Sequence, residues 1–315
     1  MPWLPKIEIL MATYQGAPYL EVQLNSILNQ TYSNCSLLIR DDGSKDETLE
    51  ILRAFQSRFP ERISLLPSGE TRGVIGNFST LLAHSTADYL LFADQDDCWH
   101  PDKVERTFRK MLELEGYAGK KTALLVHTDL AIVDAALQPQ RPSFWKYAHL
   151  FPQAKQLSRL LMQNIVTGCT MMINRSLAEQ AQPIPQEAMM HDWWLALAAA
   201  AFGEIGEVSE PTILYRQHGR NQLGAKDRRP LSLLLQGMKS GGEALQKGRL
   251  TFAAQQKQGE VFLKRFQTLL TEEQRQVLHA FLELATASSL RRTYLMQQHQ
   301  LYKHGALRNA AFLLL

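Results

Sequence analysis

The sequence predicts an α/β fold: an open, mostly parallel sheet with flanking helices, followed by an all-helical C-terminal extension. Short apolar runs alternate with helical patterns along the first 130 residues. This alternation is typical of a parallel sheet covered by helices on both faces. From Leu231 onward only helical spacing is found. The chain of 315 residues, 45% hydrophobic and 21% charged, is long enough for one large domain with an appendage.

The expected elements follow one another regularly. Strands are expected at 7–11, 36–40, 63–66, 89–93, 123–127, 168–174 and 212–215. Helices are expected at 16–30, from 46, at 76–84, 101–115, 191–202, 231–246, 250–270, 272–287 and 289–303. The polar, glycine-containing segment 219–229 predicts a mobile loop. We therefore expect a sheet-containing α/β domain at 1–225 and a helical region at 226–315.

Each element has a local reason. The helix at 16–30 places apolar residues on one face, and the helix from 46 repeats that spacing; these residues are Leu20, Leu24, Ile27 and Leu28, then Leu49, Leu52 and Phe55. The continuous apolar run 89–93 predicts a strand buried on both faces. Pro101 suits the first turn of the helix that follows.

Three carboxylates follow the strand at 89–93. Asp94, Asp96 and Asp97 lie within four positions, and such crowding is unfavourable unless a cation or hydrogen-bond donors offset it. The carboxyl end of a strand is also where open α/β sheets bind ligands. A hard divalent ion, Mg²⁺ or Mn²⁺, is the natural counter-charge. The alternative is a solvated acidic turn that caps the helix beginning near Pro101.

Charge is distributed unevenly. Residues 1–215 carry 18 basic and 25 acidic side chains, whereas residues 216–315 carry 16 basic and 6 acidic ones. At 289–315 basic and apolar residues interleave without acids. This pattern suits a helix lying on anionic lipid, and also a helix that binds another protein. Nucleic acid is a weaker interpretation, since no helix-turn-helix or zinc spacing accompanies the charge.

Targeting signals and cysteines indicate the compartment. The first residues show no signal-peptide pattern, and no window reaches the roughly 18 apolar residues of a spanning helix. The three cysteines are widely spaced, which argues against disulfides or structural zinc and fits a reducing cytosol.

Six stretches together resemble glycosyltransferase family 2. They are Met11–Tyr14, Ser26–Tyr32, Arg40–Asp46, Gly73–Phe78, Ala93–Trp99 and His191–Trp194. Within that family, Asp-Gln-Asp-Asp-x-Trp and His-Asp-Trp-Trp look most like bacterial rhamnosyltransferases of surface polysaccharide assembly. The resemblance implies a GT-A fold with a Rossmann-like sheet. It also implies a nucleotide-sugar donor, a divalent metal and inverting transfer.

The resemblance assigns donor and metal roles. Asp96 is the expected metal ligand, with Asp94 as its companion and His218 completing the metal site. Asp97 is expected to support the metal site indirectly or to cap a helix. Asp42 is expected to accept a hydrogen bond from the nucleotide base, with Tyr14 as an aromatic wall. The remaining expected donor contacts are Ala12, Arg72, Asn77, Asp94, Gln95 and Arg216.

The chemistry of inversion needs a general base, and Asp192 occupies the family's position for it. The family more often has Glu-Asp where this chain has His191-Asp192. His191 is expected to tune Asp192 or to bind sugar hydroxyls. Trp193 and Trp194 are expected either in the core or as an apolar floor for the acceptor sugar.

The function predicted is transfer of L-rhamnose from dTDP-L-rhamnose to a saccharide acceptor, with Mg²⁺ or Mn²⁺. The acceptor would be a lipid-linked oligosaccharide of O-antigen, capsule or other surface polysaccharide, and the enzyme would lie on the inner face of the cytoplasmic membrane. One alternative keeps the mechanism with a UDP-hexose donor, glucose or galactose. More remote alternatives are a sugar nucleotidyltransferase and a non-catalytic glycan-binding protein.

Overall fold

The computed structural model describes residues 4–219 and 230–313. In chain order the first half contains β1 (Ile7–Thr13), α1 (Ala17–Leu28), β2 (Cys35–Asp41), α2 (Thr48–Arg58), β3 (Ile63–Leu65), α3 (Gly73–His84), β4 (Tyr89–Ala93), β5 (Cys98–Trp99), α4 (Lys103–Ala118), β6 (Ala123–Val133) and β7 (Pro139–Arg141). The second half contains α5 (Phe144–Ala148), α6 (Leu157–Met162), the 3₁₀ turn η1 (Gly168–Thr170), β8 (Met172–Asn174), α7 (Arg175–Ala181), α8 (His191–Phe202), β9 (Gly203–Arg216), α9 (Pro230–Phe266), α10 (Glu272–Glu283), α11 (Ser289–His299) and α12 (Ala306–Leu313).

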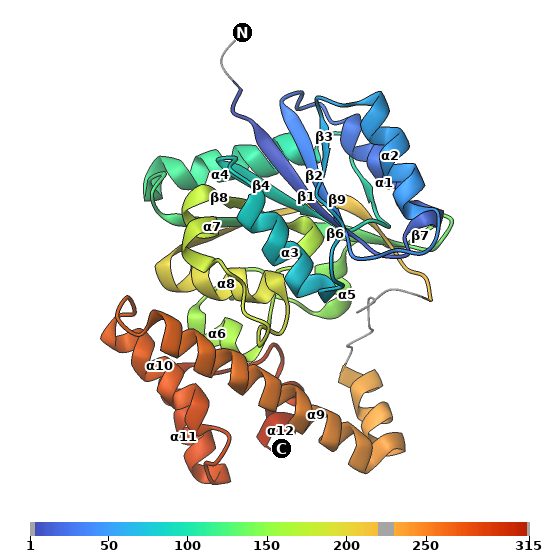
Figure 1. The fold of residues 1–315 in the computed structure, drawn as a ribbon. Coiled ribbons are helices and arrows are strands. Elements are labelled where there is room, and N and C mark those ends of the chain that lie inside the picture. The colour runs from blue at the N-terminus through green and yellow to red at the C-terminus, as the bar shows by residue number, and fades with distance from the viewer. Residues whose placement is uncertain (1–3, 220–229, 314–315) are drawn as a thin grey trace.

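One mixed sheet organises the described chain (Figure 1). Its order is β3-β2-β1-β4-β8-β6-β9-β5, with β7 paired to β6. Strands β3, β2, β1 and β4 are parallel, whereas β8 is antiparallel to both of its neighbours, β4 and β6. The α/β fold with flanking helices is confirmed, but the sheet is less parallel than the sequence predicted. Apolar spacing cannot give strand direction, because a buried strand has the same pattern in either orientation.

The register of three neighbouring strands determines where the functional loops lie. Thr13 is paired with Asp41, and Met11 is paired with Ala93. The segments after β1, β2 and β4 therefore emerge side by side at the carboxyl edge of the sheet, as expected for a ligand site in an open α/β fold. All three carry residues that the sequence proposed for the site.

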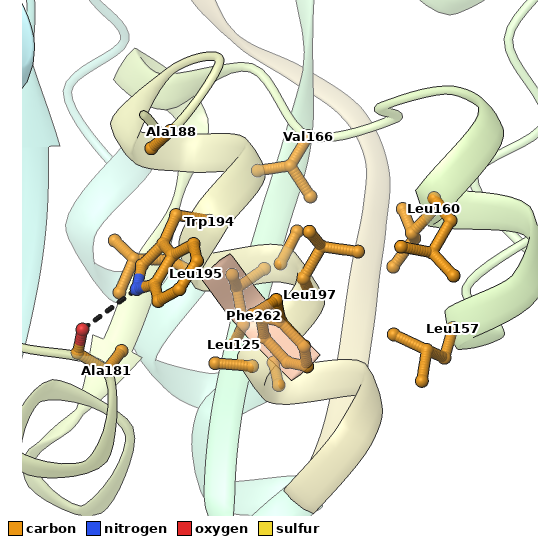
Figure 2. Packing of buried hydrophobic residues seen from close by; sticks show 14 of the residues in the cluster. Leu125, Leu157, Leu160, Val166, Ala181, Ala188, Trp194, Leu195, Leu197 and Phe262 are labelled. Atoms are coloured by element: carbon orange, nitrogen blue, oxygen red, sulfur yellow. Dashed lines mark hydrogen bonds between the residues drawn. The ribbon is translucent and has the colours of Figure 1, made fainter. Parts of the chain in front are cut away.

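The core lies on both faces of the sheet. One apolar cluster joins α1, α2 and α4 to the sheet. The other joins α3, α6, α7 and α8 to the opposite face and continues into α9, α10, α11 and α12. Figure 2 shows its centre, where Trp194 of α8 and Phe262 of α9 pack together with ring centroids 5.3 Å apart. The C-terminal helices thus form a layer on the catalytic region.

Several expected elements have different bounds. The two helices expected at 231–246 and 250–270 form one helix, α9. The strand expected at 212–215 is the end of the longer β9, whose residues 203–210 include Glu204, Glu207 and Glu210 and therefore form no apolar run. The strand expected at 168–174 begins only at Met172, because Gly168–Thr170 turns as a 3₁₀ helix. Most of the loop expected at 219–229 lies outside the described residues.

The C-terminal surface is less apolar than its sequence suggests. Leu295, Met296, Leu301 and Phe312 are buried in the core. Leu290, Tyr294 and Leu307 remain exposed. None of the described helices combines the length and apolar character needed to cross a bilayer.

Replacing Phe262 tests whether α9 is integral to the fold. Phe262 is fully buried against Trp194, so Phe262→Ala should lower the free energy of unfolding by about 3–5 kcal/mol. Leu290→Ala is the control, because Leu290 is 87% exposed, and it should change that energy by less than about 0.5 kcal/mol. Urea denaturation measures both. An equally small loss for Phe262→Ala would contradict the packing described.

Candidate active site

The acidic loop between β4 and β5 is held by the end of β9. The Nε2 atom of His218 lies 2.8 Å from Oδ2 of Asp96. The Nε–H of Arg216 donates to the backbone carbonyl of Asp96 at 2.7 Å. Residues more than a hundred positions apart in the sequence therefore meet at one turn. The structure brings together Asp96 and His218, two of the three residues expected to form the metal site.

Asp97 points into the protein and does not cap a helix. It is fully buried, and its Oδ1 accepts the backbone N–H of Arg216 at 3.2 Å. The N-cap position of α4 is occupied by Asp102 instead, so the expectation that Asp97 caps this helix is wrong. Burial, with the nearby charges of Asp96 and Asp94, raises the pKa of Asp97 well above its usual value.

Asp94 and Asp192 both have shifted pKa values. Burial, together with the charges of Asp96 and Asp192, raises the pKa of Asp94 to about 7. Burial alone raises the pKa of Asp192 to about 7, against the lowering effect of its hydrogen bonds. One of these bonds comes from Nδ2 of Asn164 to Oδ1 at 3.1 Å. Asp192 is the first-turn acid of α8, close enough to Asp94 for their charges to interact.

His191 is the first residue of α8 and precedes Asp192. Its imidazole stacks on Phe78 with ring centroids 4.1 Å apart and on Phe92 at 5.6 Å. Burial lowers its pKa to about 3, so the ring is neutral at physiological pH. A Cβ on Gly168 would lie 2.7 Å from its Nε2, and no other residue fits there unless His191 moves. Only 4% of His191 is exposed, which favours support of Asp192 over contact with acceptor hydroxyls.

Gln95 joins the acidic loop to the end of β1. Its Oε1 accepts the N–H of Tyr14 at 2.9 Å, and its Nε2 donates to the Tyr14 carbonyl at 2.8 Å. A side chain at Gly16 would collide with this amide, because a Cβ there would lie 2.2 Å from Oε1. The amide of Gln95 is therefore engaged with backbone. The phenol of Tyr14 is 54% exposed and accessible to a ligand.

Asp42 and Asn77 form a buried network with Arg40. Oδ1 of Asp42 accepts from Arg40 and from the backbone N–H of Arg72, each at 2.9 Å, and Oδ2 accepts the N–H of Gly73 at 2.9 Å. Asn77 exchanges hydrogen bonds with Arg40 and is 2% exposed. The donor-contact prediction is wrong for Asn77, whose amide faces the protein. Asp42 is also only 4% exposed, and three of the about four hydrogen bonds that a carboxylate accepts are made within the protein.

Tyr19 is a site neighbour that sequence reasoning missed. Its ring stacks on the imidazole of His218 with centroids 4.5 Å apart, and the guanidinium carbon of Arg216 lies 4.8 Å from its centroid. It occupies the first turn of α1, just beyond β1. The sequence does contain a signal that could have identified Tyr19. It is an aromatic residue in the first helical turn after a strand that carries site residues. Because Arg216 is 4% exposed, we find it supporting the loop rather than facing solvent.

The two tryptophans differ. Trp194 is fully buried and donates its indole N–H to the carbonyl of Ala181 at 2.8 Å (Figure 2). The acceptor-contact prediction is therefore wrong for Trp194, which is a core residue. Trp193 is partly exposed and donates to the carbonyl of Leu160 at 2.7 Å. Ala12, near the end of β1, is also partly exposed, and Arg72 is exposed beside α3.

The donor set fits a divalent cation. Asp96 offers a carboxylate oxygen 2.8 Å from the imidazole nitrogen of His218, and Asp94 offers a second carboxylate close enough to Asp96 for their charges to interact. Carboxylate oxygens are the ligands that suit Mn²⁺ or Mg²⁺. Burial, and then the neighbouring charges of Asp96 and Asp192, disfavour the ionised form of Asp94. A cation bound there would offset their repulsion.

The chain matches one family model and several curated proteins. The model described as Glycosyl transferase family 2 matches residues 8–180. The dTDP-rhamnosyl transferase RfbG of Shigella flexneri is 32% identical over 229 residues, which cover 68% of this chain and 74% of that protein. A β-1,3-glucosyltransferase of Escherichia coli, WfgD, which uses UDP-glucose by its name, is 32% identical over 107 residues, 34% of this chain and 41% of that protein.

Solved structures share the fold at low sequence identity. TarS 1–349 of S. aureus, in complex with UDP-GlcNAc, has a TM-score of 0.55 at 14% identity, covering 98% of this chain and 90% of that one. The mannosyltransferase PcManGT of Pyrobaculum calidifontis, in complex with GDP-Man and Mn²⁺, has a TM-score of 0.54 at 17% identity, covering 99% of this chain and 79% of that one.

Proposed function

The chain belongs to glycosyl transferase family 2, and from this premise we propose that it transfers L-rhamnose, with inversion, from dTDP-L-rhamnose to a saccharide acceptor. The coarser function, a glycosyltransferase of polysaccharide synthesis, follows from the family and its relatives. One observation carries the mechanism. Asp96, His218 and Asp94 converge at the carboxyl edge of the sheet, and Asp192 lies close to Asp94.

Asp192 acts as the general base in this proposal. Its raised pKa of about 7 makes the carboxylate a stronger base than an exposed aspartate, yet a substantial fraction is ionised at neutral pH. Ionised Asp192 takes the proton from the acceptor hydroxyl as that oxygen attacks the anomeric carbon. Asn164 orients the carboxylate by donating to Oδ1.

Negative charge develops on the leaving diphosphate and must be offset. Asp96, Asp94 and His218 would hold the Mg²⁺ or Mn²⁺, which supplies Lewis-acid stabilisation of that charge when bound. Tyr19 keeps the His218 ring facing Asp96 through stacking. Tyr14, which is exposed, is available to stack on the nucleotide base, whereas Asp42 is 4% exposed and its carboxylate is engaged by Arg40 and two backbone N–H groups.

The donor sugar has a second candidate. The matched segment of WfgD supports a UDP-hexose donor, since that relative is named for UDP-glucose. The longer match to RfbG favours dTDP-L-rhamnose. The mechanism is the same for both.

A thermal-shift comparison distinguishes these donors. With Mn²⁺ present, dTDP-L-rhamnose should raise Tm more than UDP-glucose or UDP-galactose, because a ligand that binds only the folded state stabilises it. The shift should be lost in Asp96→Ala and retained in Asp88→Asn, whose exposed side chain lies at the opposite end of β4. A larger shift with UDP-glucose would favour the alternative, and no shift with any nucleotide sugar would refute the proposed function.

Replacing Asp192 tests the base. Asp192→Asn should reduce kcat by about 10²–10⁴-fold, which is the usual contribution of a general base, while donor binding remains. In the wild type, kcat should rise with pH around 7, because the carboxylate must lose its proton to act. Steady-state kinetics across pH 5.5–8.5 measures both effects. Wild-type turnover by Asp192→Asn, or a rate that falls through this range, would exclude Asp192 as the base.

We propose that the C-terminal helices dock on the inner face of the cytoplasmic membrane, where a lipid-linked acceptor would lie. Leu290 and Tyr294 of α11 are exposed beside the basic pair Arg291 and Arg292. Deleting this region would uncover the core contacts of Leu295 and Phe312, so point variants are the better probe.

Binding to anionic vesicles tests this docking. The double variant Leu290→Asn/Tyr294→Asn should bind phosphatidylglycerol vesicles at least about five-fold more weakly than the wild type, because it removes apolar area from the interface. Leu112→Asn on α4 is the control, since Leu112 is also exposed but lies in the catalytic region. Co-sedimentation measures all three proteins. Equal binding by all three would exclude α11 as the docking element.

A further inference from the structure

Three polar side chains of α1 and the residues just after it point into the protein. They belong to Gln23, Ser26 and Gln30, whose spacing of three and four positions follows the helical repeat. Gln23 is fully buried, Gln30 is 8% exposed and Ser26 is half-buried. Burial of a polar group is unfavourable unless the group is hydrogen-bonded. The partners of these side chains therefore indicate what they do.

Gln23 is bonded to the first residue of the acidic loop. Its Nε2 donates to the backbone carbonyl of Asp94 at 2.8 Å. The hydroxyl of Ser26 donates to Oε1 of Gln23 at 3.0 Å, which orients the amide with its N–H groups toward the loop. Gln23 therefore fixes the backbone at the point where the acidic loop leaves β4.

Ser26 and Gln30 hold the chain that follows the acidic loop. Oγ of Ser26 accepts the backbone N–H of Trp99, in β5, at 3.0 Å. Nε2 of Gln30 donates to the carbonyl of His100 at 2.8 Å, and its Oε1 accepts the N–H of Val104, in α4, at 3.0 Å. These two side chains thus make three hydrogen bonds to the backbone between β5 and the start of α4.

The acidic loop is consequently anchored by two different elements. From the end of β9, Arg216 donates to the carbonyl of Asp96. From α1, Gln23 donates to the carbonyl of Asp94. Both bonds fix the backbone without using a carboxylate oxygen. Ligands of a cation must be held close to their productive geometry, and the groups that orient them affect metal affinity strongly.

We propose that Gln23, Ser26 and Gln30 are positioning residues of the active site, whose hydrogen bonds to the backbone hold the acidic loop in the conformation that binds a divalent cation. None of the three contacts the donor or the cation in this account. They give a role to the stretch Ser26–Tyr32, one of the six that resemble the family. The proposal rests on the proposed function only in taking Asp94 and Asp96 as metal ligands.

Two variants of the full-length protein remove these hydrogen bonds. Gln23→Met keeps the length of the side chain but cannot donate to the carbonyl of Asp94. Ser26→Ala is a smaller change that removes the acceptor of the Trp99 N–H. For every variant we would measure Tm, the affinity for Mn²⁺ alone by calorimetry, and hydrogen exchange of the backbone amides of residues 94–104.

Two control variants lie on the same helix. Leu24→Ala controls for lost stability, because Leu24 is fully buried and its apolar side chain packs in the core. Asn25→Ala controls for the loss of a side-chain amide, because Asn25 is exposed.

Gln23→Met should lower Tm by about 2–6 °C, because it leaves the carbonyl of Asp94 without this buried partner. It should weaken Mn²⁺ binding at least about ten-fold, and Ser26→Ala should weaken it at least about three-fold. Leu24→Ala should lower Tm at least as much as Gln23→Met, yet bind Mn²⁺ within about two-fold of the wild type. Amides of residues 94–104 should exchange faster in Gln23→Met and Ser26→Ala than in Leu24→Ala. Asn25→Ala should match the wild type in all three measurements.

Unchanged Mn²⁺ affinity in both Gln23→Met and Ser26→Ala would overturn the proposal. An equal loss of affinity in Leu24→Ala would also overturn it, because the effect would then follow stability alone. If Gln23→Met does not fold, Ser26→Ala decides by the same criteria. Failure of the proposed function has a different signature. A wild-type protein that binds no Mn²⁺ would refute the metal role, while hydrogen exchange of residues 94–104 would still show whether α1 holds the loop.

Discussion

Electrostatic repulsion among the carboxylates of the loop after β4 is the constraint on which the site depends. Three acids within four positions cannot all be partly or fully buried and ionised unless positive charge and hydrogen-bond donors meet them. The end of β9 supplies the guanidinium of Arg216 and the imidazole of His218. Strand β9 is long enough to reach the loop from the far side of the sheet. The site therefore depends on the mixed topology of the sheet, because that topology brings the end of β9, with these two side chains, to the acidic loop.

Burial and neighbouring groups give the aspartates and the histidine of the site different pKa values and hydrogen-bond partners. Asp192 and Asp94 have raised pKa values and can exchange protons or bind a cation near neutral pH. Asp42, by contrast, is held by an arginine and two backbone N–H groups. His191, which is stacked between aromatic rings, stays neutral. Chemically equivalent residues acquire separate roles because their surroundings differ.

The sequence predicted the parallel half of the fold well, since continuous apolar runs and short loops depend on local spacing. It also predicted that the loops after β1, β2 and β4 lie together, because the carboxyl ends of neighbouring parallel strands share one edge. The antiparallel insertion of β8 was not predictable in this way, since it depends on contacts between distant segments. Asn77 was misjudged for a related reason. Whether a polar side chain faces a ligand or the interior is decided by tertiary packing, which a charged or amide residue type does not reveal.

The contact between Trp194 and Phe262 has a consequence for how this chain can be recombined with its relatives. Asp192 lies in the first turn of the same helix, α8, that carries Trp194 two residues later, and Phe262 belongs to the helical layer. The base candidate is therefore anchored on a helix whose other side is packed by α9. A chimaera that exchanges only the sheet-containing region would place the α8 surface of one relative against the α9 surface of another. These two surfaces would not have evolved to pack together. Experiments that transfer substrate specificity between relatives should therefore keep α8 and α9 together as one unit. The loops at the carboxyl edge of the sheet are the part that can be exchanged.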